Sequence, residues 1–292
     1  MKIAVSGETP GRDYNLTQIA EYLNQYGVSA IEIWPENIPA LEGKETVKRL
    51  YKNRNISAAA NILRTKNIET ACVAFGAAFD KELCSDTYLY TRELIRSIET
   101  AVELGASFVN HYLYYLSMTD KADVEKMKKI YSPAIEVAEK NSIYLVLENE
   151  AHDSTKNPIE MRHIVEAMGS SNFKTNFDVT NYYQASYEGF PYAYEVLKEY
   201  IAYVHIKDGC LNFPEHGHRM ETLGEGMSGF LSGEKIQYPV IGTGAVNLDG
   251  LIKVLHRDHV THWCTLEPHT TREYWHQYVK LEIEYLKNRN IN

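Results

Sequence analysis

The chain has 292 residues and carries 39 acidic against 30 basic side chains, a formal net charge of −9. Binding to nucleic acid needs clustered Lys and Arg that replace counterions, so this charge argues against a DNA or RNA partner. No apolar run approaches membrane-spanning length, and no Pro-, Gly- or Ser-rich stretch divides the chain, so we expect one domain over residues 1–292 and no membrane partner. Residues 1–5 run directly into a strand-like segment instead of a leader peptide, and we therefore expect a soluble, cytoplasmic protein.

Short β-branched runs recur along the chain, and each is followed by apolar residues at helical spacing. The expected strands are, in chain order, Lys2–Ser6, Ala30–Trp34, Ile68–Phe75, Ser107–His111, Ser142–Glu148, Phe173–Asp178, Ile201–Lys207 and His262–Glu267. Eight such units suit either a closed barrel or a doubly wound open sheet, and no GxGxxG or GxxxxGK[ST] loop follows the first strand. The pattern therefore favours a single (β/α)8 TIM barrel of the α/β class.

Helix boundary signals support the same alternation. Apolar stripes at helical spacing end at Gly27 and at Gly105, as glycine often follows a helix. Asn157 and Pro158 are typical of a helix start, with a side-chain cap followed by proline at the first helical position. Pro133 falls inside an otherwise regular stripe, and we expect a kink or a late helix start there.

The last four expected strands each end in a residue that can bind a metal, and strand alternation directs all four toward the barrel axis. These residues are Glu148, Asp178, His205 and Glu267. Three carboxylates buried together would repel one another unless a cation neutralised them. The pattern predicts one divalent metal ion. Oxygen donors with one imidazole suit Mn²⁺ first, and also Mg²⁺, Co²⁺, Fe²⁺ or Zn²⁺, while the absence of thiolates argues against a structural zinc site.

Other polar side chains at strand ends are candidates for substrate binding. The candidates are Trp34, His111, Glu150, His152, Asn176, Lys207 and His269. Lys207 is expected to point inward, two residues after a metal ligand. The long segment 208–241 holds Arg219, which would bind substrate if this segment is a lid and would be solvated if it is an ordinary loop. For each candidate the alternative is ordinary packing.

Several short motifs resemble signatures of the xylose isomerase-like barrel superfamily, which includes sugar isomerases, ketose 3-epimerases, inosose dehydratases and endonuclease IV. These motifs are Ile31-Glu32-Ile33-Trp34, Leu147-Glu148-Asn149, His205-Ile206-Lys207-Asp208, and Gly242-Thr243-Gly244 followed by Leu266-Glu267. The resemblance covers essentially the whole chain. It implies that the four strand-end residues correspond to the family's Glu-Asp-His-Glu metal site and that Glu148 and Glu267 exchange the substrate proton, as the two glutamates do in the ketose 3-epimerases.

The resemblance implies a metal-dependent isomerase or epimerase that acts on a small sugar or polyol by proton transfer through a metal-stabilised enediolate. A lyase or dehydratase of a keto-inositol or 3-keto sugar is the main alternative, because elimination begins with the same proton abstraction. Endonuclease IV-like hydrolysis is disfavoured, since Asn181 occupies the position of a histidine in that enzyme's three-metal cluster. Asn181 is instead assigned to substrate binding. Barrels of this type often associate, so a homo-oligomer is an expected alternative to a monomer.

Overall fold

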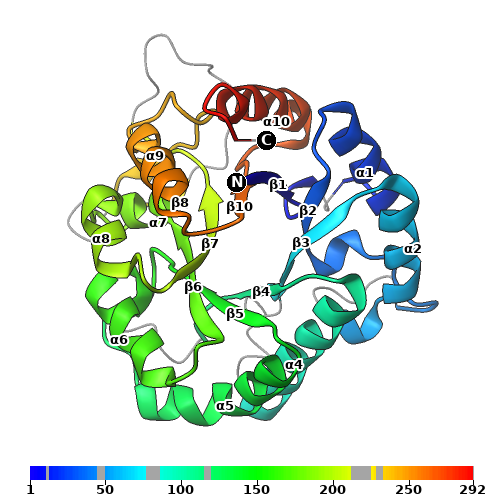
Figure 1. Cartoon of the computed structure of the whole chain (residues 1–292), viewed down its shortest axis with the longest axis horizontal. Helices are drawn as coiled ribbons and strands as arrows, with labels where there is room; N and C mark the ends of the chain where they lie inside the picture. The colour runs from blue at the N-terminus through cyan, green and yellow to red at the C-terminus, as the bar shows by residue number, and fades with distance from the viewer. Residues whose placement is uncertain are drawn as a thin grey trace.

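A computed structural model of the chain describes residues 1–10, 13–44, 50–76, 86–114, 120–211, 225–227 and 233–291. Eight parallel strands close into a barrel in the order β1-β10-β7-β6-β5-β4-β3-β2 (Figure 1). The strands are β1 Lys2–Ser6, β2 Ala30–Ile33, β3 Glu69–Ala74, β4 Phe108–His111, β5 Tyr144–Glu148, β6 Phe173–Asp178, β7 Ile201–Ile206 and β10 Trp263–Leu266. The (β/α)8 architecture expected from the alternating pattern is confirmed.

Helices surround the barrel as an outer ring (Figure 1). They are α1 Leu16–Gln25, α2 Ile56–Lys66, α4 Thr87–Leu104, α5 Val124–Lys140, α6 Pro158–Met168, α7 Val179–Gln184, α8 Tyr194–Leu197, α9 Leu248–Asp258 and α10 Arg272–Lys287. Short helical turns lie at Pro35–Asn37, Tyr51–Asn53, Ser154–Lys156 and Gly189–Ala193, and the two-residue strands β8 Glu225–Gly226 and β9 Lys235–Ile236 pair outside the barrel. Within the described residues, no helix has both the length and the apolar character needed to cross a bilayer.

The boundary signals in the sequence mark the ends of these helices. Asn157 caps α6 by accepting a hydrogen bond from the backbone N–H of Ile159, and Gly169 ends the helix with a φ of 67°. Gly105 ends α4 in the same left-handed conformation, which glycine adopts at little cost. Helix α5 begins at Val124 and continues past Pro133, so of the two expected alternatives, a kink or a late start, the late start did not occur.

Two apolar clusters hold the barrel together. The larger one joins the outward faces of the strands to the helices. The smaller one fills the barrel interior from the strands alone and consists of Ala4, Ala30, Ala71, Cys72, Val146, Tyr203 and Trp263. Most of these side chains are small, as the narrow interior requires. They close the barrel below the carboxyl ends of the strands, where the polar residues gather.

The short strand β4 places Asn110 inward and His111 outward. Asn110 donates a hydrogen bond from Nδ2 to Glu148 Oε2 at 2.7 Å inside the barrel. The side chain of the next residue must point to the opposite face, and the His111 ring lies 5.4 Å from the Tyr131 ring and 5.3 Å from the Phe173 ring. The expectation that His111 binds substrate is therefore corrected, because its ring packs toward the helices.

The burial of His111 predicts that the free energy of unfolding decreases at acidic pH. Burial lowers the pKa of His111 to about 3, so below its ordinary value of 6.5 the unfolded chain binds a proton that the folded chain does not. At pH 5 this difference destabilises the fold by about 2 kcal/mol, and the effect vanishes above pH 7. In His111→Leu, which has a similar volume, we expect the free energy of unfolding to fall less than in wild type between pH 7 and pH 5. Urea unfolding at both pH values measures this, and parallel pH profiles would contradict a buried, neutral His111.

Candidate metal centre and active site

The four predicted metal ligands converge at the carboxyl end of the barrel. Glu148, Asp178, His205 and Glu267 each offer one donor atom, and these atoms all lie within 4.8 Å of one another. They stand on or directly after β5, β6, β7 and β10, which are neighbours in the barrel, and Asp178 pairs with His205 in the strand register. All four side chains are buried. The convergence follows from parallel strands that end at one edge.

Glu148 presents one oxygen to the centre and has the other held by amides. Its Oε1 lies 3.2 Å from His205 Nδ1. Its Oε2 accepts hydrogen bonds from Nδ2 of Asn110 at 2.7 Å and from Nδ2 of Asn176 at 3.2 Å. Burial, with the Glu267 carboxylate nearby, raises the pKa of Glu148, although His205 opposes that shift. The two amides therefore leave Oε1 as the oxygen that faces the centre.

Asp178 and Glu267 share the ammonium group of Lys207. Asp178 caps α7, because its Oδ1 accepts hydrogen bonds from the backbone N–H groups of Thr180 and Asn181. Lys207 Nζ lies 2.9 Å from Asp178 Oδ2 and 2.7 Å from Glu267 Oε2. Burial alone would lower the pKa of Lys207, but the two carboxylates raise it well above its usual value. Lys207 and then His205 in turn bring the pKa of Glu267 well below its usual value, against the effect of burial.

His205 lies between two groups of carboxylates. Its Nδ1 is 3.2 Å from Glu148 Oε1 and 3.3 Å from Glu267 Oε1, and its Nε2 is 2.8 Å from Glu32 Oε2. Burial alone would lower the pKa of His205, but Glu148 and Glu32 hold it well above the usual value. Nδ1 is therefore the ring nitrogen that belongs to the convergent donor set.

The chemistry of this donor set fits a divalent metal ion. Three carboxylate oxygens and one imidazole nitrogen are ligands that Mn²⁺, Mg²⁺ and Zn²⁺ accept. Each ligand also has a neighbour that fixes its orientation, as metal sites commonly require. The buried cluster could thus bind one metal ion, and its donors alone do not distinguish among these metals.

Two predicted substrate residues border the ligands directly. Asn181 lies beside Glu148, with its Nδ2 3.5 Å from Oε1, and donates a second hydrogen bond to the carbonyl of Asn149 at 2.8 Å. Glu150 is half-buried, and burial together with the charge of Glu148 raises its pKa well above the usual value. Both residues therefore stay predictions for substrate contact.

Trp34 lies behind the ligands, and its indole N–H is committed to other protein groups. Nε1 is 3.0 Å from Ser6 Oγ and 3.3 Å from Glu32 Oε1. The Trp34 ring lies 6.4 Å from the ring of Tyr112. The indole N–H is therefore not available to a substrate. A substrate contact of Trp34 remains a prediction only for the face of its ring.

The other predicted side chains form a rim from loops that follow different strands. His152 is exposed, and its Nε2 lies 3.3 Å from Gln184 Nε2. Gln184 Oε1 accepts a hydrogen bond from the Tyr238 hydroxyl at 3.3 Å. The Tyr238 ring lies 4.6 Å from the His269 ring and 6.0 Å from Lys207 Nζ. This rim connects His152 and His269 to the four predicted metal ligands through Lys207. Arg219 lies outside the described residues.

Several residues of the site were absent from the predicted set, and the sequence signals of four of them differ. Glu32 interrupts the apolar run Ala30–Ile33, and a charged residue at an inward position of such a strand marks a site. Asn110 would have followed from the correct register of β4. Tyr112 is buried, and burial with Glu148 and Glu267 nearby raises its pKa well above the usual value. The long segment that contains Tyr238 carries no periodic pattern, so no signal points to this residue.

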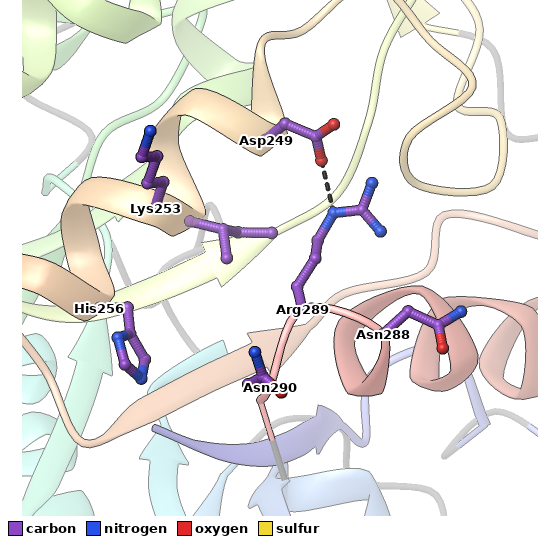
Figure 2. A pocket seen from close by; sticks show the side chains of 7 residues that line it. Asp249, Lys253, His256, Asn288, Arg289 and Asn290 are labelled. Carbon is purple, nitrogen blue, oxygen red and sulfur yellow. Dashed lines mark hydrogen bonds and ion pairs between the residues drawn. The ribbon is translucent and has the colours of Figure 1, made fainter.

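A separate surface pocket lies on the outside of the barrel, between α9 and the residues that follow α10 (Figure 2). Its lining contains none of the four ligands. Arg289 pairs there with Asp249, and its guanidinium group lies 3.4 Å from the centre of the Tyr285 ring. Because Asp249 already neutralises this cation, the pocket shows no chemistry comparable with that of the barrel mouth.

Comparisons with known proteins agree with this architecture. A family model described as xylose isomerase-like TIM barrel matches residues 20–289. No curated protein matches the chain in sequence.

Solved structures share the fold at low identity. The probable 3-DHS dehydratase AsbF from Bacillus anthracis has a TM-score of 0.70 and 15% identity, covering 99% of this chain and 100% of that chain. The xylose isomerase-like TIM barrel protein from Mycobacterium smegmatis in complex with magnesium has a TM-score of 0.69 and 13% identity, covering 98% and 95%. The 3-keto-D-glucoside 4-epimerase YcjR from E. coli has a TM-score of 0.68 and 15% identity, covering 99% of both chains. The family model spans most of the sequence, and the chain therefore belongs to the xylose isomerase-like TIM barrel family.

Proposed function

We propose that this protein is a metal-dependent isomerase or epimerase of a small carbohydrate. The observation that carries the proposal is the buried convergence of Glu148, Asp178, His205 and Glu267 at the mouth of the barrel. Similar structures that include a sugar epimerase and a magnesium complex support it. Mn²⁺ is the metal we propose first, because hard oxygen donors predominate and one imidazole accompanies them.

In this proposal the four ligands hold the cation, and the surrounding residues keep the ligands in place. A bound divalent cation polarises the carbonyl group of the substrate and makes the neighbouring C–H bond more acidic. Asn110 and Asn176 hold the outer oxygen of Glu148, whereas Lys207 holds the outer oxygen of Glu267. The inner oxygens of both glutamates are thereby left to face the centre, where the cation and the substrate would lie.

Glu148 and Glu267 are the proposed acid/base pair. Glu148 ends β5 and Glu267 directly follows β10, and these strands are separated in the barrel by β6 and β7, so the two carboxylates approach the centre from different sides. One can remove a proton from one face of the substrate while the other returns a proton to the opposite face. This arrangement suits epimerisation, whereas isomerisation can use one of the two carboxylates alone.

Replacing either glutamate by glutamine tests this pair. Glu148→Gln and Glu267→Gln each keep an oxygen donor but lose the ability to accept a proton, so we expect kcat to fall by roughly 10²–10⁴-fold with metal bound. Metal content must be measured on the same samples at saturating Mn²⁺, because both residues are also ligands. Full turnover in both variants with metal present would show that the mechanism is wrong.

A dehydratase is the second candidate, and the structural likeness to a probable dehydratase favours it. Elimination shares the first proton abstraction and differs in whether a leaving group departs from the next carbon. We expect the metal-reconstituted protein to convert a ketose, an inosose or a 3-keto sugar into a product of unchanged mass. Mass spectrometry with NMR reads the outcome directly, since a product lighter by one water assigns the protein to the lyases instead.

The charges at the site predict a substrate without a phosphate group. Among the Lys and Arg residues that the structure describes, Lys207 reaches the ligands, and Asp178 and Glu267 already occupy its ammonium group. A phosphate ester would therefore find no uncompensated ammonium or guanidinium group beside the ligands in the described part of the site. We expect kcat/KM for a free sugar to exceed that for its phosphate ester by at least about tenfold. The comparison needs matched pairs at one ionic strength, and a preference for the ester would contradict an uncharged substrate.

A further inference from the structure

Glu32 occupies an inward position of β2, beneath the four ligands. Its side chain is completely buried, and its Oε2 lies 2.8 Å from Nε2 of the equally buried His205. Its other oxygen, Oε1, lies 3.3 Å from both Ser6 Oγ and Trp34 Nε1. Trp34 Nε1 is in turn 3.0 Å from Ser6 Oγ. Glu32 is therefore fixed between the barrel wall and the imidazole ring.

An imidazole that binds a metal through one nitrogen must keep its proton on the other. The hydrogen bond made by the second nitrogen decides which tautomer forms and how the ring is turned. In His205 the two nitrogens face different groups: Nδ1 faces Glu148 and Glu267, whereas Nε2 faces Glu32. A carboxylate can only accept at Nε2, so this arrangement keeps the lone pair at Nδ1 for a cation.

We propose that Glu32 is a positioning residue of the metal centre. It accepts the Nε2–H hydrogen bond of His205 and holds Nδ1 toward the three ligand carboxylates. This inference rests on the proposed function in requiring a metal, but it concerns how tightly the metal is held and is independent of the reaction catalysed.

The surroundings of Glu32 suit a positioning role better than a catalytic one. Ser6 and Trp34 donate to its carboxylate from two neighbouring segments, and the Tyr203 ring on β7 lies 5.8 Å from the ring of His205. Tyr203 is itself held by the Thr265 hydroxyl, which donates to its phenol oxygen at 2.6 Å. With no exposed surface and its oxygens occupied by protein donors, Glu32 acts on the substrate only through His205.

Metal affinity measures this role without any substrate. The probe is Mn²⁺ alone, titrated into metal-free wild type, Glu32→Ala and Glu32→Gln, with binding followed by calorimetry or electron paramagnetic resonance. We expect Glu32→Ala to raise the Kd for Mn²⁺ by roughly 10–100-fold, as the loss of such a partner typically does. Glu32→Gln should raise it by a smaller factor, because its amide oxygen can still accept from Nε2–H.

Glu282 supplies a matched control. It is a fully buried carboxyl on α10 and is not one of the residues around the ligands. Glu282→Gln should keep the Kd for Mn²⁺ within about twofold of wild type, since it replaces a buried carboxyl group without touching the hydrogen bond to His205. Thermal unfolding of all variants shows whether any change in affinity reflects a loss of fold.

A spectroscopic readout separates positioning from general support. In Zn²⁺-loaded protein labelled with ¹⁵N-histidine, the His205 signal, assigned by its absence in His205→Gln, should show a protonated Nε2 and a metal-bound Nδ1. In Glu32→Gln this Nε2–H signal should shift and exchange faster with water. If Glu32→Ala does not fold, Glu32→Gln decides through both readouts.

The outcomes distinguish the two proposals. Unchanged Mn²⁺ affinity in every folded Glu32 variant, with an unchanged His205 signal, would overturn the role of Glu32 and leave the proposed function intact. A wild-type protein that binds neither Mn²⁺ nor Zn²⁺ would contradict the proposed function itself.

Discussion

The structure depends on the electrostatic compensation of three buried carboxylates that lie within a few ångströms of one another. Charges removed from water are costly unless opposite charges or hydrogen-bond donors compensate them. Here Lys207 joins Asp178 to Glu267, and His205 joins Glu148 to Glu267. The ammonium group and the imidazole thus share the neutralisation of the cluster. A bound cation would add the compensation that a full set of ionised ligands demands, which makes affinity for a metal a consequence of the charge balance.

The barrel supplies the geometry that this balance requires. Parallel strands end at one edge, and β5, β6, β7 and β10 are consecutive around the barrel, so their last inward residues meet without any long loop. Below them the interior is closed by small apolar side chains together with Tyr203 and Trp263. The apolar layer excludes water from one side of the cluster, which strengthens each electrostatic contact and requires that the ligands be oriented by protein groups.

The four ligands could be predicted from sequence because period-two alternation operates cleanly in strands whose outward residues are strongly apolar. In β5, for example, Leu145 and Leu147 identify the outward face and leave Glu148 inward. Strand β4 is shorter, and two adjacent polar residues, Asn110 and His111, compete for the inward position. Val109 lies in the outer cluster and so decides the register, a contact that propensity alone does not reveal. The hydrogen bond between Glu32 and His205 joins residues 173 positions apart, and only the closed barrel brings them together.

The same constraint explains why the proposed metal ligands alone do not determine the reaction. Proton abstraction next to a carbonyl group needs a polarising cation and a base. The ligand cluster can hold the cation and supply the base, and this is equally true when the product is an isomer, an epimer or an alkene. What differs is the position of the remaining substrate hydroxyls relative to a proton donor. In the described part of the barrel mouth, the residues that would set this position lie outside the cluster. They are above all Glu150 and the rim that joins Gln184, Tyr238 and His269. These segments follow different strands, so they can vary while the strand ends that carry the proposed metal ligands stay unchanged.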